Sequence, residues 1–246
     1  YLLSAQEASA MMIQTLSPPP PEEEGVNMMD NQTSEVQKLV NTLGENIHVL
    51  LSAEIRHDLK EEDKRRISRM IIGSSGAIGI FLTNGAGDTS REILLRVPVP
   101  PPPPTSTEED SDDNSPSSLV ECMISFVDMC TNDPAAMSDY KNVVSAILRL
   151  LAEWVPSTPD VISAIFTSAS SVALGVLLQN KSKTSDAPTL SAFSGILLGL
   201  CMANMKANDD IGGWSISSIM NLISVGLGMG KFTKLLEGLK KYLKEE

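Results

Sequence analysis

The 246-residue sequence contains few of the residue types that most often perform chemistry: it has two histidines, three cysteines and only 4% aromatic residues. Three cysteines are too few, and odd in number, for a disulfide framework, which indicates a reducing compartment. An initiator methionine, a charged-then-apolar leader and a cleavage site are also missing, so we expect a fragment of a longer protein. Apolar residues still make up 42%, which is enough for one continuous core and excludes a wholly disordered chain.

The candidate catalytic and metal-binding patterns are weak. His48 lies in an apolar stretch and His57 in a charged turn, and Cys122 and Cys130 lack the spacing of the usual zinc pairs, so we expect buried thiols. Residues 226–231 read Gly-Leu-Gly-Met-Gly-Lys but lack the preceding strand, the spacing and the final Ser or Thr of a phosphate loop. Their glycines predict a helix terminator with positive φ instead. The sequence therefore predicts no enzyme, no metal site and no cofactor.

The net charge of −12 is concentrated in two stretches. Residues 17–34 carry four acidic side chains and residues 98–115 carry five, with no basic residue in either. Each stretch also holds a proline run, which favours an extended backbone, and the acidic sequence beside it cannot bury enough apolar surface to fold. We predict two disordered proline-acidic insertions at 17–34 and 98–115. The remaining body is nearly neutral, which gives no electrostatic support for nucleic-acid binding.

Helical signals fill the rest of the chain. Capping-box spacing at Ser4 and Ser34, a predicted stop at Gly44, and Ser or Thr before proline at Ser115 and Thr158 mark helix ends. The predicted helical segments span residues 4–16, 34–43, 47–55, 60–82, 90–97, 115–130, 140–155, 160–166, a further helix ending near 178, 190–205, 215–225 and 232–244. No stretch alternates as a strand does, so we predict an all-α fold.

Trp154 and two uncharged stretches make specific predictions about the core. Trp154 continues an apolar helical stripe, so we predict that it is mostly buried against the next repeat. Residues 161–178 and 211–230 carry no charge and are long enough to cross a bilayer. Their serines and glycines, and the lack of flanking basic clusters or aromatic belts, favour inner helices of a helical stack instead.

The last predicted helix carries five lysines, and these are our candidate partner- or membrane-binding residues: Lys231, Lys234, Lys240, Lys241 and Lys244. Its apolar side is predicted to comprise Leu235, Leu236, Leu239, Tyr242 and Leu243. One interpretation is an amphipathic helix that closes the stack, with solvated lysines near a helix C-terminus. The other is a basic face for an acidic partner or an anionic membrane.

Several segments of the C-terminal half, in this order, carry a family resemblance. They are Leu94–Val97, the helix from Leu119 to Cys130, Ala146–Trp154, Phe193–Cys201 and Gly228–Leu235. Together they resemble the end of the armadillo-like globular head of the general vesicular transport factors, the long coiled-coil tethers of the early secretory pathway. The resemblance covers about residues 70–246, whereas residues 1–69 match less well and both insertions depart from the pattern.

The resemblance implies a single armadillo/HEAT-like α-solenoid domain over residues 1–246. It implies a non-catalytic vesicle tether in ER-to-Golgi and intra-Golgi transport, a cytoplasmic protein peripheral to the cytosolic face of Golgi and vesicle membranes. Its expected partners are a Rab GTPase, SNAREs, golgins and tethering complexes, and the full-length protein is expected to be a homodimer. No partner-binding residue can be carried over from a short motif. Two alternatives stay open: another armadillo or HEAT scaffold, such as a transport receptor or regulatory subunit, and a small helical membrane protein.

Overall fold

The computed structural model describes residues 27–84, 94, 99, 118–156, 158–167, 171–178, 187–206, 211 and 213–245. The helices in this part of the chain are α2 (Asn27–Leu51), α3 (Ala53–Asp58), α4 (Glu61–Asn84), α6 (Leu119–Asn132), α7 (Pro134–Trp154), α8 (Pro159–Thr167), α9 (Ser171–Leu178), α10 (Ala187–Asn204), α11 (Ile216–Gly226) and α12 (Met229–Glu245). The described residues contain no strand, only an isolated bridge between Ile211 and Trp214. The all-α prediction is confirmed.

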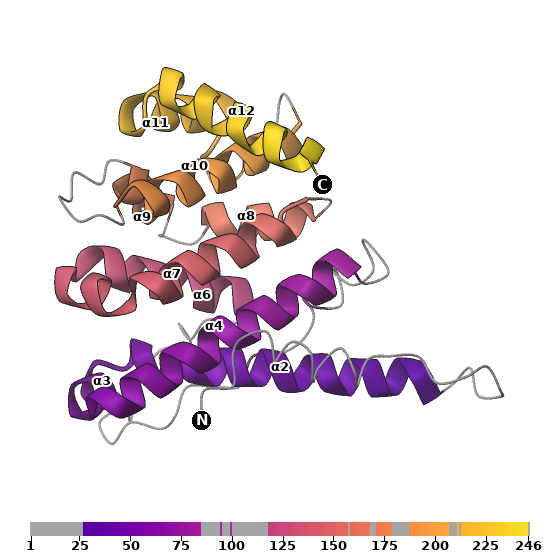
Figure 1. The fold of residues 1–246 in the computed structure, drawn as a ribbon, viewed down its shortest axis with the longest axis vertical. Coiled ribbons are helices and arrows are strands. Elements are labelled where there is room, and N and C mark those ends of the chain that lie inside the picture. Colours follow the sequence, from indigo (N-terminus) through magenta and orange to yellow (C-terminus); the bar gives the residue numbers. More distant parts are fainter. Residues whose placement is uncertain are drawn as a thin grey trace.

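Most of the described helices form pairs that follow one another along the long axis of the molecule, from α2 and α4 at one end to α11 and α12 at the other (Figure 1). Within the pairs, α2 contacts α4, α6 contacts α7, α9 contacts α10 and α11 contacts α12. Between pairs, α2, α6, α9 and α11 contact one another in that order, and so do α4, α7, α10 and α12. The described helices therefore lie in two rows, and each pair packs on the next.

One apolar core runs through the whole stack. In α2 the stripe comprises Val36, Val40, Leu43, Ile47 and Leu50, all buried, which is the spacing of one helical face. The same cluster continues through α4, α6, α7, α9 and α10 to Phe232 on α12. Trp154 at the end of α7 has no exposed surface, so its predicted burial is confirmed.

Helix ends follow local capping chemistry, with two predicted caps misplaced. Ser34, predicted to begin a helix, lies inside α2. Ser118, not Ser115, is the N-cap of α6: its hydroxyl accepts from the Glu121 amide at 3.2 Å, and the Glu121 carboxylate accepts from the Ser118 amide. Asp133 caps α7 ahead of Pro134 and lies 3.8 Å from the guanidinium of Arg56 on α3. Gly228, with φ +85°, separates α11 from α12, as the predicted helix terminator requires.

The predictions for the N-terminal region need correction. Helix α2 begins at Asn27, so residues 27–34 are helical and that part of the predicted 17–34 insertion is wrong. Gly44 is buried inside α2 and does not end it, because the apolar stripe continues to Leu50 and outweighs one glycine. Residues 17–26 lie outside the described residues. So does the predicted insertion at 98–115, apart from Val99, which packs partly buried against the core.

The two uncharged stretches are each divided between helices. Residues 161–178 are shared by α8 and α9, and residues 211–230 include α11 and the turn at Gly228. Among the described helices, none combines the length and apolar character needed to cross a bilayer.

Glycines bring the last pair close to the pair before it. A Cβ atom at Gly175 of α9 would lie 2.9 Å from a methyl carbon of Leu222 on α11. A Cβ at Gly199 of α10 would lie 2.9 Å from the ring of Phe232 on α12, and one at Gly195 would lie 3.2 Å from Leu227. Such distances are shorter than ordinary van der Waals contacts, so these helices approach closely because the glycines lack a side chain.

Candidate functional site

The five predicted lysines all belong to α12, but the structure describes the side chains of only two. Lys231 and Lys234 are exposed. Lys240, Lys241 and Lys244 lie within the helical range, and their side chains fall outside the described residues. The two described lysines are accessible to a partner and to solvent alike.

The apolar side of α12 differs from the prediction. Phe232 is buried and Leu235 is half-buried against the core, whereas Leu236 is 41% exposed. The contact face therefore centres on Phe232, which the sequence prediction omitted. Phe232 and Leu235 are three residues apart and both face α10 through Gly199 and Gly195, whereas Leu236 lies beyond the edge of that contact.

A second surface lies at the other end of the stack, where the beginning of α4 meets the beginning of α7. A depression of about 280 Å³ opens there between the two helices. Its lining comprises Glu61, Lys64, Arg65, Ser68, Arg69 and Ile72 from α4, and Asp139, Tyr140, Asn142 and Val143 from α7.

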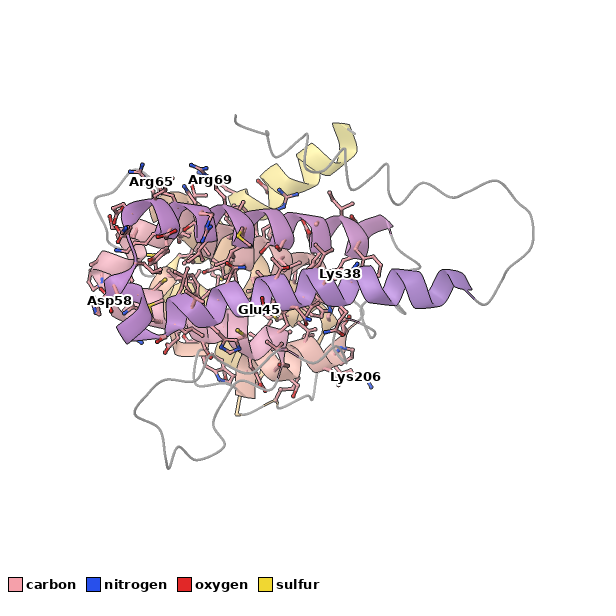
Figure 2. The ribbon with its side chains drawn as sticks, turned by 90° about the horizontal axis from the view of Figure 1, so that it is seen from below. Lys38, Glu45, Asp58, Arg65, Arg69 and Lys206 are labelled. Atoms are coloured by element: carbon pink, nitrogen blue, oxygen red, sulfur yellow. The ribbon has the colours of Figure 1, made fainter. Side chains whose placement is uncertain are left out.

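The cations of α4 around this depression are not equivalent. Lys64 pairs with Glu61 at 3.4 Å and Arg66 pairs with Asp63 at 3.6 Å, each over three residues of the helix. Arg65 and Arg69 form no ion pair or hydrogen bond with the described part of the chain. Figure 2 shows both on the edge of α4 that faces away from α2, with their side chains directed outward.

Tyr140 forms part of the wall of the depression and has an unusual environment. Its ring packs edge-on against Phe126, with the ring centroids 6.0 Å apart, and only 2% of the residue is exposed. Its hydroxyl is buried without a hydrogen-bond partner among the described residues. Burial, and the negative charge of Asp139, raise the pKa of Tyr140 to about 12, so the phenol is protonated at neutral pH and can donate a hydrogen bond.

The thiols are buried, as predicted. Desolvation raises the pKa of Cys122, Cys130 and Cys201 to about 12 in each case, so all three are protonated at neutral pH. The Sγ atom of Cys122 lies 3.9 Å from Nε2 of His48, which is also buried. Within the described residues, no three His, Cys, Asp or Glu side chains converge as metal ligands do.

Sequence reasoning missed Arg65, Arg69 and Ile72 as surface residues of interest. Their spacing of four and three places them on one side of a helix, and this signal was present in the sequence. The sequence did not reveal which of these cations form ion pairs. Glu62 precedes Arg65 by three residues, the same spacing as in the Glu61–Lys64 and Asp63–Arg66 pairs, yet no ion pair joins Glu62 to Arg65 in the structure.

No family model, no curated protein and no solved structure matches this chain. Function is therefore inferred from its residues and its fold alone.

Proposed function

We propose that the chain is a non-catalytic α-solenoid of the armadillo or HEAT kind that serves as a protein-binding scaffold. One observation carries the proposal: the described helices lie in two rows, and each pair packs on the next (Figure 1). A stack of this kind buries one continuous core while its rows present long outer surfaces, which suits a protein with several partners. The buried, protonated thiols also lack the electropositive, accessible setting of a catalytic cysteine.

We propose further that this scaffold is the head of a vesicle tether in transport between the endoplasmic reticulum and the Golgi apparatus. The ordered resemblance of residues 70–246 to the general vesicular transport factors supports this role. A Rab GTPase, SNAREs, golgins and tethering complexes are the proposed partners, on the cytosolic face of Golgi and vesicle membranes. The exposed Lys231 and Lys234 on α12 offer positive charge for an acidic partner or an anionic membrane.

A binding experiment with the purified chain tests the tether role. The chain is immobilised and exposed to a panel of Rab GTPases loaded with a non-hydrolysable GTP analogue or with GDP, to SNARE cytoplasmic domains, and to isolated Golgi membranes. We expect at least one Rab to bind in its GTP form only, and Golgi membranes to be retained. A chain that is folded by circular dichroism and retains none of these would exclude the tether role and leave a scaffold of another kind, such as a transport receptor or regulatory subunit.

A further inference from the structure

One side of α4 combines positive charge and an exposed apolar side chain. Arg65, Arg69 and Ile72 follow one another at intervals of four and three residues, and Ile72 is 36% exposed. Gly76, four residues further, is also exposed, and a Cβ atom built there would meet no other atom within 4 Å. We call Arg65, Arg69 and Ile72 the α4 arginine face; beside Gly76 another backbone could approach closely.

The two arginines of this face form no ion pair within the described part of the chain. Lys64 and Arg66 are neutralised by Glu61 and Asp63, but Arg65 and Arg69 have no acidic partner within the described chain. Two guanidinium groups one helical turn apart match two carboxylates one turn apart on another helix. The complementary partner is therefore acidic, with its carboxylates at regular helical spacing.

The depression next to the arginines supplies an apolar seat. Ile72 of α4 and Val143 of α7 both line it, so an aliphatic side chain from a partner can be buried there. Tyr140 contributes to the wall of the depression, but its hydroxyl is fully buried and takes no part in the proposed contact. A partner that brings an aliphatic side chain and carboxylates together can fill the depression and pair with the two arginines.

We propose that the α4 arginine face and the adjoining α4–α7 depression bind an acidic amphipathic helix of a partner protein. Two carboxylates one turn apart pair with Arg65 and Arg69, and an aliphatic residue of the same helix enters the depression. A flat anionic membrane fits less well, because it would also meet the exposed Glu61 and Asp139, which line the same depression as the two arginines. A narrow helix can meet the arginines and avoid these carboxylates.

The inference deepens the proposed function, since it assumes a protein-binding scaffold, but it does not depend on vesicle tethering. The probes are two short, helix-stabilised fluorescent peptides, each with two glutamates four residues apart. In one peptide a leucine follows the second glutamate by three residues, and in the other a leucine precedes the first glutamate by three residues. Their binding to the full chain is measured by fluorescence anisotropy at low and high salt. We expect saturable binding of at least one peptide that weakens as salt rises, because charge pairs at a surface are screened.

Matched variants locate the binding surface. Arg65→Gln with Arg69→Gln should weaken binding about tenfold or more, as the loss of two charge-assisted contacts predicts. Ile72→Ser should weaken it about threefold to tenfold through the lost apolar contact. Lys38→Gln with Lys206→Gln removes the same charge from two other exposed sites, one on α2 and one just after α10, both labelled in Figure 2. This variant should leave binding within about twofold.

The inference would be overturned if neither peptide binds, including the case in which phosphatidylserine vesicles bind in an arginine-dependent way instead. Equal binding of peptides with glutamine in place of glutamate, or equal binding by the double arginine variant, would also overturn it. Self-association lost in the double arginine variant would assign the face to a second copy of the chain and also overturn it. If the chain binds a Rab GTPase or Golgi membranes but neither peptide, this inference alone is refuted. If it binds a peptide but no Rab GTPase, SNARE or Golgi membrane, the tether role alone is refuted.

Discussion

The ring of Phe232 on α12 lies against Gly199 on α10, so closely that a Cβ atom at position 199 would be 2.9 Å from the ring Cζ. Phe232 is the buried residue of α12 among those whose side chains the structure describes. This one contact therefore does much to hold the last helix on the stack. It also fixes which side of α12 faces inward, and so which lysines face outward.

Gly199→Ala should lower the free energy of unfolding even though alanine favours helix. The added methyl group must displace the Phe232 ring, and overpacking of this kind costs about 1–3 kcal/mol. Alanine gains roughly 1 kcal/mol over glycine in a helix, so the net loss is about 0–2 kcal/mol. Urea unfolding followed by circular dichroism measures the difference. Phe232→Leu in the same chain should recover part of the loss, and a Gly199→Ala protein more stable than wild type would contradict the close contact.

Gly73→Ala and Gly76→Ala should have the opposite effect. Both glycines are exposed inside α4, and nothing lies within 4 Å of a Cβ atom at either position. Each substitution should raise the free energy of unfolding by about 0.5–1 kcal/mol, because the unfolded chain loses freedom and the helix gains a better former. The same urea titration applies, and destabilisation by either alanine would show that α4 is packed there by something else.

Trp154→Ala should destabilise the protein by about 3–5 kcal/mol, since a fully buried indole leaves a large cavity. The indole of Trp154 should also emit at the short wavelengths of an apolar environment. Trp214, which is partly buried and stacks on Phe166 with ring centroids 5.5 Å apart, complicates the spectrum. The measurement is therefore made in a Trp214→Phe background, where an emission maximum typical of water would be incompatible with the buried position.

The three cysteines should resist thiol reagents in the native state. Burial raises their pKa from 9.0 to about 12, so little thiolate exists at pH 8, and unfolding in urea should make all three react. Because the folded state holds these protons more tightly, their contribution to stability is complete below pH 9. It declines as pH rises from 9 towards 12, by at most about 1.4 kcal/mol per pH unit for each thiol. Fast labelling of native protein at pH 8 would disprove the burial.

Charge reversal of Lys234, Lys240 and Lys241 to glutamate tests the basic face of α12. Helicity and urea stability should stay near those of the wild type, because Lys234 is exposed and surface charges contribute little to folding. If α12 binds an acidic partner or membrane, salt-sensitive capture of Golgi membranes should fall, with each lysine near an anionic surface worth about 1 kcal/mol. Unchanged capture at every salt concentration would reduce α12 to a helix that closes the stack.

Much of the secondary structure could be predicted from the sequence because its signals are local. Thr158 before Pro159, Ser215 before α11, and Gly228 between α11 and α12 mark ends that the structure shares, since caps and positive φ depend on a few neighbouring residues. One error arose where a local signal met a longer apolar stripe. Gly44 lies in such a stripe, and α2 continues through it.

The candidate surfaces were less predictable. The lysines of α12 could be read from their spacing, but the part of α12 that turns inward depends on Gly195 and Gly199 of a different helix. The depression beside Arg65 and Arg69 joins residues of α4 to residues of α7 that lie about seventy positions away. No periodicity within one helix can report such a pairing.

The sequence by itself determined an all-α chain, the apolar stripes of its helices and the burial of Trp154 and the thiols, because these follow from side-chain chemistry repeated at helical intervals. Only the tertiary structure decided that the described helices pair into two rows and that Phe232, not Leu236, anchors α12. It also decided that Lys64 and Arg66 form ion pairs, whereas Arg65 and Arg69 form none with the described residues. Those outcomes depend on which helix surfaces meet in space. Two helices can approach closely at a glycine, or leave a gap between them, only through the side chains that both helices present to the contact.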